Sequence, residues 1–356
     1  MKQKSVLIGM SGGVDSSVAA ALLKEQGYHG IGATMRLWTY SDSCNMKHEG
    51  CCAESAVEDA RRVCDKLGID FYVMNFKDMF KDKVVDYFVD EYIHGRTPNP
   101  CIACNKYLKF DALLKKALAM GIDYVATGHY AKIEKGEDGK YILRASEAVK
   151  KDQSYVLYNF TQEQLAHTLM PLGGYNKDWV RQKAEELGLG VAHKPDSQEI
   201  CFVEDDDYAK FITDYSGYKP KEGDILDVNG NVIGKHRGLI YYTIGQRKGI
   251  GAYGRPMFVM KIDAENNTIT LGEKGMEFSN ELTAYDVNFV SGEFPKENML
   301  ITAKVRYQAP PAAAMLCPQK DGTVKLMFPE PQRAVTPGQA VVFYDGDIVL
   351  GGGTVL

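Results

Sequence analysis

A glycine-rich turn near the N-terminus joins an expected strand at residues 5–8 to an expected helix at residues 14–26. The turn reads G-M-S-G-G-V-D-S and consists of Gly9, Met10, Ser11, Gly12, Gly13, Val14, Asp15 and Ser16. A strand, a glycine turn and a helix in this order direct backbone N–H groups and the helix N-terminus towards an anion. The glycines let the backbone approach that anion closely, and the serine hydroxyls add donors. The turn therefore predicts a phosphate-binding loop.

Asp15 distinguishes this turn from the common phosphate-binding loops. A carboxylate beside a phosphate is repulsive unless a divalent cation bridges them, so we expect Mg²⁺ on Asp15. The turn lacks the lysine of the P-loop and the glycine spacing of the dinucleotide fingerprint. It resembles the S-G-G-x-D-S signature of the PP-loop ATP pyrophosphatases, which cleave ATP between the α- and β-phosphates. An ordinary strand-to-helix turn is the alternative interpretation.

Short apolar strands alternate with amphipathic helices over the first 130 residues. The expected strands are 5–10, 30–35, 71–75 and 124–127, and one expected helix is 107–120. Such alternation predicts an α/β fold with a doubly wound parallel sheet. Ligands of such sheets bind beyond the carboxyl ends of the strands, which is where the glycine turn lies.

The pattern changes after this first region. We expect a hairpin at 129–145, helices at 162–170 and 177–187, a loop at 193–202, and mainly β structure from about residue 217 onward. Three domains follow from this division. They are a PP-loop catalytic domain with helical insertions (1–205), a small, basic, β-rich central domain (206–278) and a C-terminal β-barrel (279–356).

Charge is distributed unevenly along the chain. The net charge is −5, but residues 216–261 contain eight Lys and Arg against three acids, which leaves −10 on the remainder. A basic segment on an acidic body fits an electrostatic footprint for nucleic acid, and an ordinary solvated surface is the alternative. No apolar stretch is long enough to cross a membrane, and the N-terminus has no signal-peptide pattern. We therefore expect a cytoplasmic protein.

Eight cysteines in a protein expected in the cytoplasm indicate catalysis or metal binding rather than disulfides. Cys101 and Cys104 form a C-x-x-C pair just before the expected helix 107–120, where the helix dipole and nearby lysines favour a thiolate. Cys201 lies far along the chain, in the loop D-S-Q-E-I-C-F.

Three interpretations of these cysteines remain open. One is a sulfur-handling or redox group, and another is a set of inert reduced thiols. The third is a structural zinc site that takes its remaining ligand from Cys44, Cys51 or Cys52.

Seven motifs occur in one order along the chain. They are G-M-S-G-G-V-D-S, G-R-T-P-N-P-x-x-x-C-N, A-T-G-H-Y-A, K-D-Q-S-Y-V-L, D-S-Q-E-I-C-F, H-R-G-L-I-Y-Y-T-I-G-Q-R-K-G and V-R-Y. Together they resemble the bacterial tRNA-specific 2-thiouridylase family over essentially the whole chain.

The resemblance implies an ATP-dependent sulfurtransferase. Members of that family adenylate the C2 oxygen of the wobble uridine in tRNAs for Lys, Glu and Gln and release pyrophosphate. Adenylation is needed because the C2 oxygen leaves far more easily as part of AMP than as a carbonyl oxygen. On this resemblance residues 9–16 hold the triphosphate, Asp15 binds Mg²⁺, and Met35 and Gly128 contact the adenosine.

The same resemblance assigns the sulfur and the RNA. Cys201 receives a persulfide sulfur from a donor protein, and Cys104 helps to release it or closes a disulfide with Cys201. Asn99, Pro100 and Cys101 face the target base. Positions that match tRNA-contacting positions are His129, Lys151, Asp152, Gln153, Arg306, Tyr307 and Gln339.

The chain departs from the family pattern at Cys101. Many members have an aspartate there, a candidate acid or base, and a mostly neutral thiol is a poor substitute in proton transfer. With Cys104 and Cys201 it makes three cysteines, one ligand short of the usual four at a [4Fe–4S] cluster, which leaves one iron free for hydrosulfide. Sulfur delivery through a persulfide and delivery through such a cluster both remain open.

Two other functions fit parts of the pattern. An amide-forming PP-loop ligase would use the glycine turn but would have no use for Cys104 and Cys201. A non-catalytic nucleotide-binding module with a zinc clip would bind ATP without releasing pyrophosphate. The adjacent Cys51 and Cys52 have no assigned role.

Overall fold

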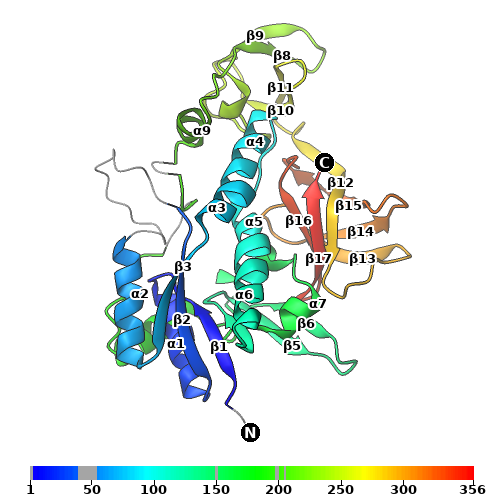
Figure 1. Ribbon diagram of the computed structural model, residues 1–356. Helices are drawn as coiled ribbons and strands as arrows, with labels where there is room; N and C mark the ends of the chain where they lie inside the picture. The colour runs from blue at the N-terminus through cyan, green and yellow to red at the C-terminus, as the bar shows by residue number, and fades with distance from the viewer. Residues whose placement is uncertain (1–2, 39–53, 149–150, 197–199, 204–205) are drawn as a thin grey trace.

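The computed structural model describes residues 3–38, 54–148, 151–196, 200–203 and 206–356. A parallel sheet forms the N-terminal part, a small four-stranded sheet the middle, and a closed antiparallel barrel the C-terminal part (Figure 1). The predicted fold class, a doubly wound α/β sheet followed by a β-rich middle and a barrel, is confirmed. Within the described residues, no helix has the length and apolar character needed to cross a bilayer.

The N-terminal sheet is parallel throughout and has the strand order β3-β2-β1-β4-β7. Its strands are β1 (Ser5–Gly9), β2 (His29–Arg36), β3 (Asp70–Asn75), β4 (Tyr124–Ala126) and β7 (Thr168–Leu169). The chain runs outward from β1 to β3 and then returns to place β4 on the other side of β1. The strand order therefore reverses between β1 and β4, the position at which open parallel sheets bind ligands.

Helices cover both faces of this sheet because each turns an apolar side towards it. One face packs against α1 (Val14–Glu25), α2 (Glu54–Leu67) and α8 (Lys177–Glu186). The other face packs against two helical runs that lie near the centre of Figure 1. These runs are α3 (Lys77–Phe80), η1 (Lys81–Asp86) and α4 (Tyr87–Ile93), and α5 (Pro100–Ala103), η2 (Cys104–Ala112) and α6 (Leu113–Ala119).

The helix predicted at residues 107–120 begins earlier than expected. It starts with α5 at Pro100, and the Asn99 side chain caps it by accepting hydrogen bonds from the N–H groups of the next two non-proline residues. Proline suits the first turn of a helix because the N–H groups of that turn have no acceptor within the helix, so the missing N–H of proline costs no hydrogen bond. Cys101 and Cys104 therefore lie inside the helix rather than before it.

The helix predicted at residues 162–170 ends earlier than expected. α7 (Gln162–Ala166) stops after five residues. Thr168 and Leu169 leave the helix and pair in parallel with β4 as the short strand β7. Pairing with the open edge of β4 completes the sheet on that side.

The middle part is a small module at the top of Figure 1. It comprises α9 (Tyr208–Ser216), β8 (Gly223–Leu226), β9 (Val232–His236), η5 (Leu239–Tyr241), β10 (Met257–Asp263) and β11 (Thr268–Glu273). The strand order is β10-β11-β8-β9, and the predicted hairpin is the β8–β9 pair. Ile240 of η5 joins the core cluster that contains Phe88 of α4, so the module is anchored on the N-terminal part.

The C-terminal barrel closes because β12 pairs with both β15 and β17. Its strands are β12 (Phe278–Phe289), β13 (Met299–Lys304), β14 (Ala312–Pro318), β15 (Val324–Arg333), β16 (Ala340–Asp345) and β17 (Ile348–Val355). The predicted hairpin, β5 (Ala131–Lys135) and β6 (Tyr141–Ala145), joins this sheet through β17. After it, η4 (Ser154–Leu157) places the buried Tyr155 hydroxyl 2.6 Å from the Ala340 carbonyl, to which it donates.

Candidate active site

The loop between β1 and α1 is held in shape by its own hydroxyl groups. The Ser16 Oγ accepts from the Ser11 N–H at 3.2 Å and donates to the Gly13 carbonyl at 3.2 Å. The Ser17 hydroxyl donates to the same carbonyl at 2.8 Å. Ser16 and Ser17 are buried. These two hydroxyls therefore shape the loop, whereas the sequence predicted the Ser16 hydroxyl only as an anion donor.

Two glycines allow the surrounding backbone to approach this loop. Gly12 has a φ of +71°, and a Cβ there would lie 2.2 Å from the carbonyl oxygen of Ala56 in α2. Gly128 follows β4, and a Cβ there would lie 2.7 Å from the Ser16 nitrogen. The predicted loop and Gly128 therefore meet where the strand order reverses. Met35 lies at the carboxyl end of the neighbouring strand β2.

Asp15 is the acidic residue of this loop, and it is held by two partners. The Lys177 Nζ lies 2.7 and 2.8 Å from its two carboxylate oxygens, and the Tyr130 hydroxyl donates to it at 2.6 Å. Burial, followed by the nearby Asp15 charge, raises the pKa of Tyr130, so this phenol stays a neutral donor. An acidic oxygen pair at the start of α1 is a donor set that suits Mg²⁺.

Asp196 is a second carboxylate beside the first. It lies 2.7 Å from the Nζ of Lys177, 2.7 Å from that of Lys151, and 3.1 Å from a guanidinium nitrogen of Arg181. Burial alone would raise the pKa of Asp196, but the hydrogen bonds from Lys151 and Lys177 outweigh it and lower that pKa. Asp196 therefore stays ionised and draws three cations together.

Several members of this cluster were not predicted from the sequence: Tyr130, Lys177, Arg181 and Lys194. Lys194 donates to the Gly12 carbonyl at 3.2 Å and pairs with Asp59 at 2.9 Å. One signal was present in the sequence. Lys177 and Arg181 are four residues apart on the helix predicted at 177–187, so they share a face.

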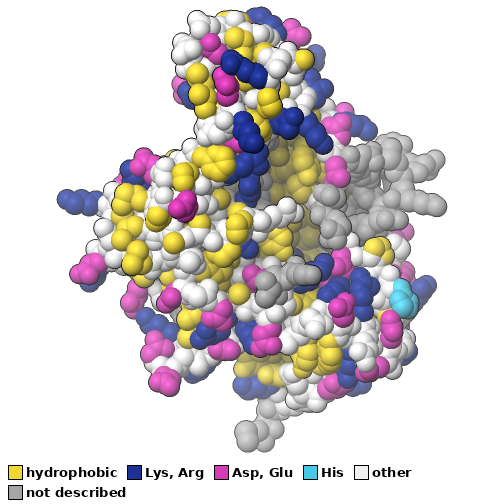
Figure 2. All heavy atoms as spheres, turned by 180° about the vertical axis from the view of Figure 1, so that it is seen from behind, with side chains coloured by type: hydrophobic (Ala, Val, Ile, Leu, Met, Phe, Trp, Pro, Cys, Tyr) yellow, Lys and Arg dark blue, Asp and Glu magenta, His cyan; other side chains and the backbone are white. Residues whose placement is uncertain are grey.

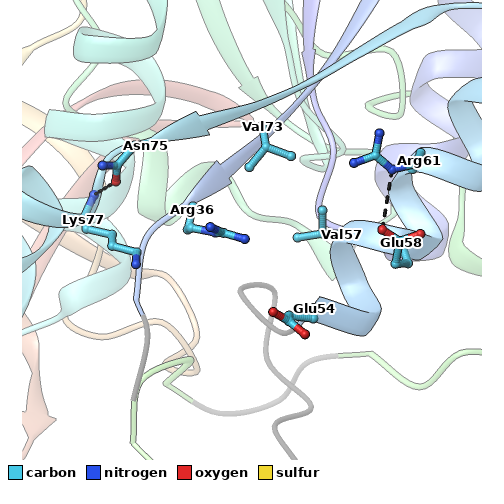
Figure 3. A pocket seen from close by; sticks show the side chains of 8 residues that line it. All are labelled: Arg36, Glu54, Val57, Glu58, Arg61, Val73, Asn75 and Lys77. Carbon is cyan, nitrogen blue, oxygen red and sulfur yellow. Dashed lines mark hydrogen bonds and ion pairs between the residues drawn. The ribbon is translucent and has the colours of Figure 1, made fainter. Parts of the chain in front are cut away.

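A separate hollow of about 560 Å³ lies where β2 and β3 end against α2 (Figure 3). Its lining side chains are Arg36, Glu54, Val57, Glu58, Arg61, Val73, Asn75 and Lys77. Arg61 pairs with Glu58 at 3.5 Å. None of these residues belongs to the predicted site, and the strand order reverses between β1 and β4 instead. We therefore centre the site on the loop.

Two of the predicted cysteines share one core cluster although they lie far apart in sequence. Cys104 is buried in the cluster below the sheet, and Cys201 packs against the same cluster together with Phe202 of the buried set. Cys101 is exposed in the first turn of α5, and its N–H donates to the Asn99 side chain at 3.1 Å. Cys104 and Cys201 therefore belong to one extended core cluster, and Cys101 is exposed.

The iron–sulfur interpretation needs Cys101, Cys104 and Cys201 to lie together. Within the described part of the chain, no three Cys, His, Asp or Glu side chains are close enough to share a metal ion. The zinc interpretation needed Cys44, Cys51 or Cys52, which lie outside the described residues.

The predicted RNA-contacting segments converge on one another. The Tyr307 hydroxyl donates to the Asp152 carbonyl at 3.1 Å, and the Gln339 side chain donates to the Thr97 carbonyl at 2.8 Å. Burial, and then the nearby Asp152 carboxylate, raise the pKa of Tyr307. Residues of the helix start, the 151–153 segment and the barrel therefore lie side by side. Arg306 adjoins this group in sequence.

Several predicted RNA contacts have structural partners. The Asp152 carboxylate accepts from the Ser146 N–H and from Ser154, and the Gln153 side chain accepts from the Tyr130 N–H. The His129 ring is buried, its Nδ1 is 2.7 Å from the Thr127 hydroxyl, and burial and then Lys109 lower its pKa. His129 is therefore neutral, and its contact with RNA stays a prediction.

Replacing Gly128 by Ala should weaken nucleotide binding. The new methyl group would lie 2.7 Å from the Ser16 nitrogen and would push the loop away from β4. We expect the affinity for Mg²⁺ and a non-cleavable α,β-methylene ATP, measured by calorimetry, to fall at least about ten-fold, or about 1.4 kcal/mol. Gly174→Ala is the control, because nothing lies within 4 Å of that Cβ position. Unchanged affinity in Gly128→Ala would contradict the placement of the site.

Comparisons with known proteins cover all three parts of the chain. The tRNA methyl transferase HUP domain matches residues 4–205, the tRNA methyl transferase PRC-barrel domain residues 209–273, and the aminomethyltransferase beta-barrel domain residues 279–355. The tRNA-specific 2-thiouridylase MnmA of Acetivibrio thermocellus is 59% identical over 358 residues, covering 100% of each chain. That of Clostridioides difficile is 58% identical over 354 residues, covering 99% of this chain and 98% of its own. The chain belongs to the tRNA-specific 2-thiouridylase family.

Proposed function

We propose that the protein converts the wobble uridine of tRNAs for Lys, Glu and Gln to 2-thiouridine. ATP activates the C2 oxygen of the base, and a persulfide on Cys201 supplies the sulfur. The observation that carries this proposal is the meeting of the Asp15 loop with Gly128 at the point where the strand order reverses. The membership in the 2-thiouridylase family supports the substrate.

The loop residues suit the activation step. The uridine C2 oxygen attacks the α-phosphorus of ATP, the bond to the β-phosphate oxygen breaks, and pyrophosphate leaves. Asp15 is the residue that would hold Mg²⁺, whose charge offsets that of the phosphates. Lys177 and Lys194, which lie at Asp15 and at the Gly12 carbonyl, add positive charge on the same side. Placing cations where charge develops is the main means by which phosphoryl-transfer enzymes accelerate the reaction.

The two clustered cysteines suit the sulfur step. The terminal sulfur of a Cys201 persulfide attacks C2 of the adenylated base, the C2–O bond breaks, and AMP leaves. The Cys104 thiolate then attacks the Cys201 sulfur, and the S–S bond breaks so that sulfur stays on the base as 2-thiouridine. A Cys104–Cys201 disulfide results, and a thiol reductant restores both thiols. Cys104 and Cys201 both pack in the same core cluster, which is compatible with this pairing.

The middle module supports RNA binding through its charge. Six of its exposed cations have no ion pair with any described residue, in contrast to Lys235, Arg255 and Lys261: they are Lys210, Lys219, Lys221, Arg237, Arg247 and Lys248. Figure 2 shows Lys and Arg side chains gathered where the module meets the rest of the molecule. Unpaired cations on an otherwise acidic protein are suited to phosphate contacts, which position an RNA without reading its sequence.

Thiolation by metal-free protein tests the proposed function. Protein purified without oxygen and treated with a chelator is given Mg²⁺, ATP, a persulfide donor and an unmodified tRNA for Glu, and 2-thiouridine is quantified by mass spectrometry. We expect thiolation without iron and one pyrophosphate released per base. Thiolation only after iron–sulfur reconstitution would contradict the persulfide route. Failure under both conditions would contradict the proposed activity.

Replacing Cys201 by Ser should abolish 2-thiouridine formation. The hydroxyl cannot carry a persulfide, but the loop around Asp15 is unchanged, so nucleotide affinity should stay within about two-fold of wild type (~0.4 kcal/mol). Cys317→Ser, in strand β14 of the barrel, is the matched control and should keep full activity. Loss of nucleotide binding in Cys201→Ser would indicate a structural cysteine, and retained thiolation would rule it out as the sulfur carrier.

A further inference from the structure

A chain of ion pairs connects the nucleotide loop to the 151–153 segment. Lys177 bridges Asp15 at 2.7 and 2.8 Å and Asp196 at 2.7 Å, and Asp196 in turn holds Lys151 at 2.7 Å. The Lys177 side chain is only 11% exposed and that of Asp196 20% exposed. Among the described residues, Lys177 alone forms ion pairs with both carboxylates. Partly buried pairs of this kind are screened less by solvent than surface pairs.

A second route links the same two segments through Tyr130. Its hydroxyl donates to Asp15 at 2.6 Å, its carbonyl accepts from the Gln153 N–H at 2.9 Å, and its own N–H donates to the Gln153 side chain at 3.0 Å. This route contains no ammonium group: its bond to Asp15 comes from a neutral phenol, and its two bonds to Gln153 join uncharged groups. The ion-pair route contains two carboxylates that compete for one ammonium group.

That competition depends on what else binds Asp15. The group of Asp15, Asp196, Lys177, Lys151 and Arg181 has two negative and three positive charges. A divalent cation held by Asp15 would repel Lys177 and replace it as the partner of that carboxylate. Lys177 would then pair with Asp196 alone, and Asp196 would hold Lys151 less strongly. Lys151 would thereby become available to an RNA phosphate.

We propose that Lys177 is a positioning residue that couples occupancy of the nucleotide loop to RNA binding at the 151–153 segment. The inference rests on the proposed function for the identity of the two ligands. It predicts that a bound Mg²⁺–nucleotide raises the affinity for tRNA. By linkage, tRNA raises the affinity for the nucleotide by the same factor.

Binding measurements test this coupling without catalysis. The dissociation constant of an unmodified tRNA for Glu is measured by fluorescence anisotropy with and without Mg²⁺ and saturating α,β-methylene ATP. We expect the nucleotide to tighten tRNA binding at least about five-fold in the wild type, the lower end of usual allosteric couplings. In Lys177→Gln the ratio should fall below about two-fold. An unchanged ratio in that variant would overturn the proposal.

A matched control lies on the same pair of helices. Lys183 of α8 pairs with Glu25 of α1 at 2.9 Å. Lys183→Gln therefore removes an ion pair between α1 and α8 but leaves the ion pairs of Asp15 and Asp196 in place. Its coupling ratio should equal that of the wild type. A loss of coupling in Lys183→Gln would assign the effect to helix packing. Tyr130→Phe should keep the coupling between nucleotide and tRNA binding. Loss of the coupling in Tyr130→Phe would assign it to the hydrogen bonds through Tyr130.

A further variant covers the case in which Lys177→Gln no longer binds nucleotide. Asp196→Asn leaves the Asp15–Lys177 pair in place and removes the connection to Lys151, so it should bind nucleotide and lack coupling; retained coupling would overturn the proposal. Wild-type protein that forms 2-thiouridine but has no coupling would refute the inference and leave the proposed function intact. Wild-type protein that binds neither ligand would refute both.

Discussion

The contact between Gly128 and the first turn of α1 is the constraint on which the site depends. β1 and β4 are parallel neighbours, so the loops that follow them emerge at the same edge of the sheet. A Cβ at Gly128 would lie 2.7 Å from the Ser16 nitrogen, and one at Gly12 would lie 2.2 Å from a carbonyl of α2. Only hydrogen atoms fit at either position. The backbone therefore forms a tight cradle at the positive end of a helix, where phosphates bind.

The barrel contributes to the site by fixing distant segments. Gln339 donates to the Thr97 carbonyl at 2.8 Å, two residues before Asn99, which caps the helix that carries Cys101 and Cys104 (the cysteine helix). Tyr307 donates to the Asp152 carbonyl at 3.1 Å. The buried Tyr155 hydroxyl donates to Ala340 at 2.6 Å, which ties the 151–153 segment to the barrel core. Because these contacts cross between parts of the chain, the barrel positions both the cysteine helix and the proposed RNA segment.

Much of the fold was predictable because its signals are local. The glycine turn, the alternation of strands and helices, and the β-rich C-terminal third each follow from patterns within a few residues. The helix predicted at 107–120 starts earlier, at Pro100, because Asn99 before it is a good cap and proline fits the first helical position. The two-residue strand β7 depends on the open edge of β4 and has no local signal.

The charged part of the site could not be predicted in the same way. Asp15 and Lys177 are 162 residues apart, and their ion pair depends on how α8 packs against α1. Asp15 was predicted as a site residue because it belongs to the glycine turn. Lys177 was not predicted, because it lies on an ordinary amphipathic helix with no motif. Likewise, Cys104 and Cys201 were paired by family resemblance, and their common core cluster is a property of the packed structure. Long-range pairings of this kind depend on tertiary packing rather than on local propensity.

The proposed function requires that ATP activates the C2 oxygen of the uridine at the Asp15 loop. The most direct test uses a tRNA for Glu with ¹⁸O at C2 of the wobble uridine, together with ATP, Mg²⁺ and a persulfide donor. If the oxygen is adenylated and then displaced by sulfur, each AMP released during thiolation carries one ¹⁸O atom in its phosphate. AMP without the label, formed while 2-thiouridine accumulates, would contradict this account.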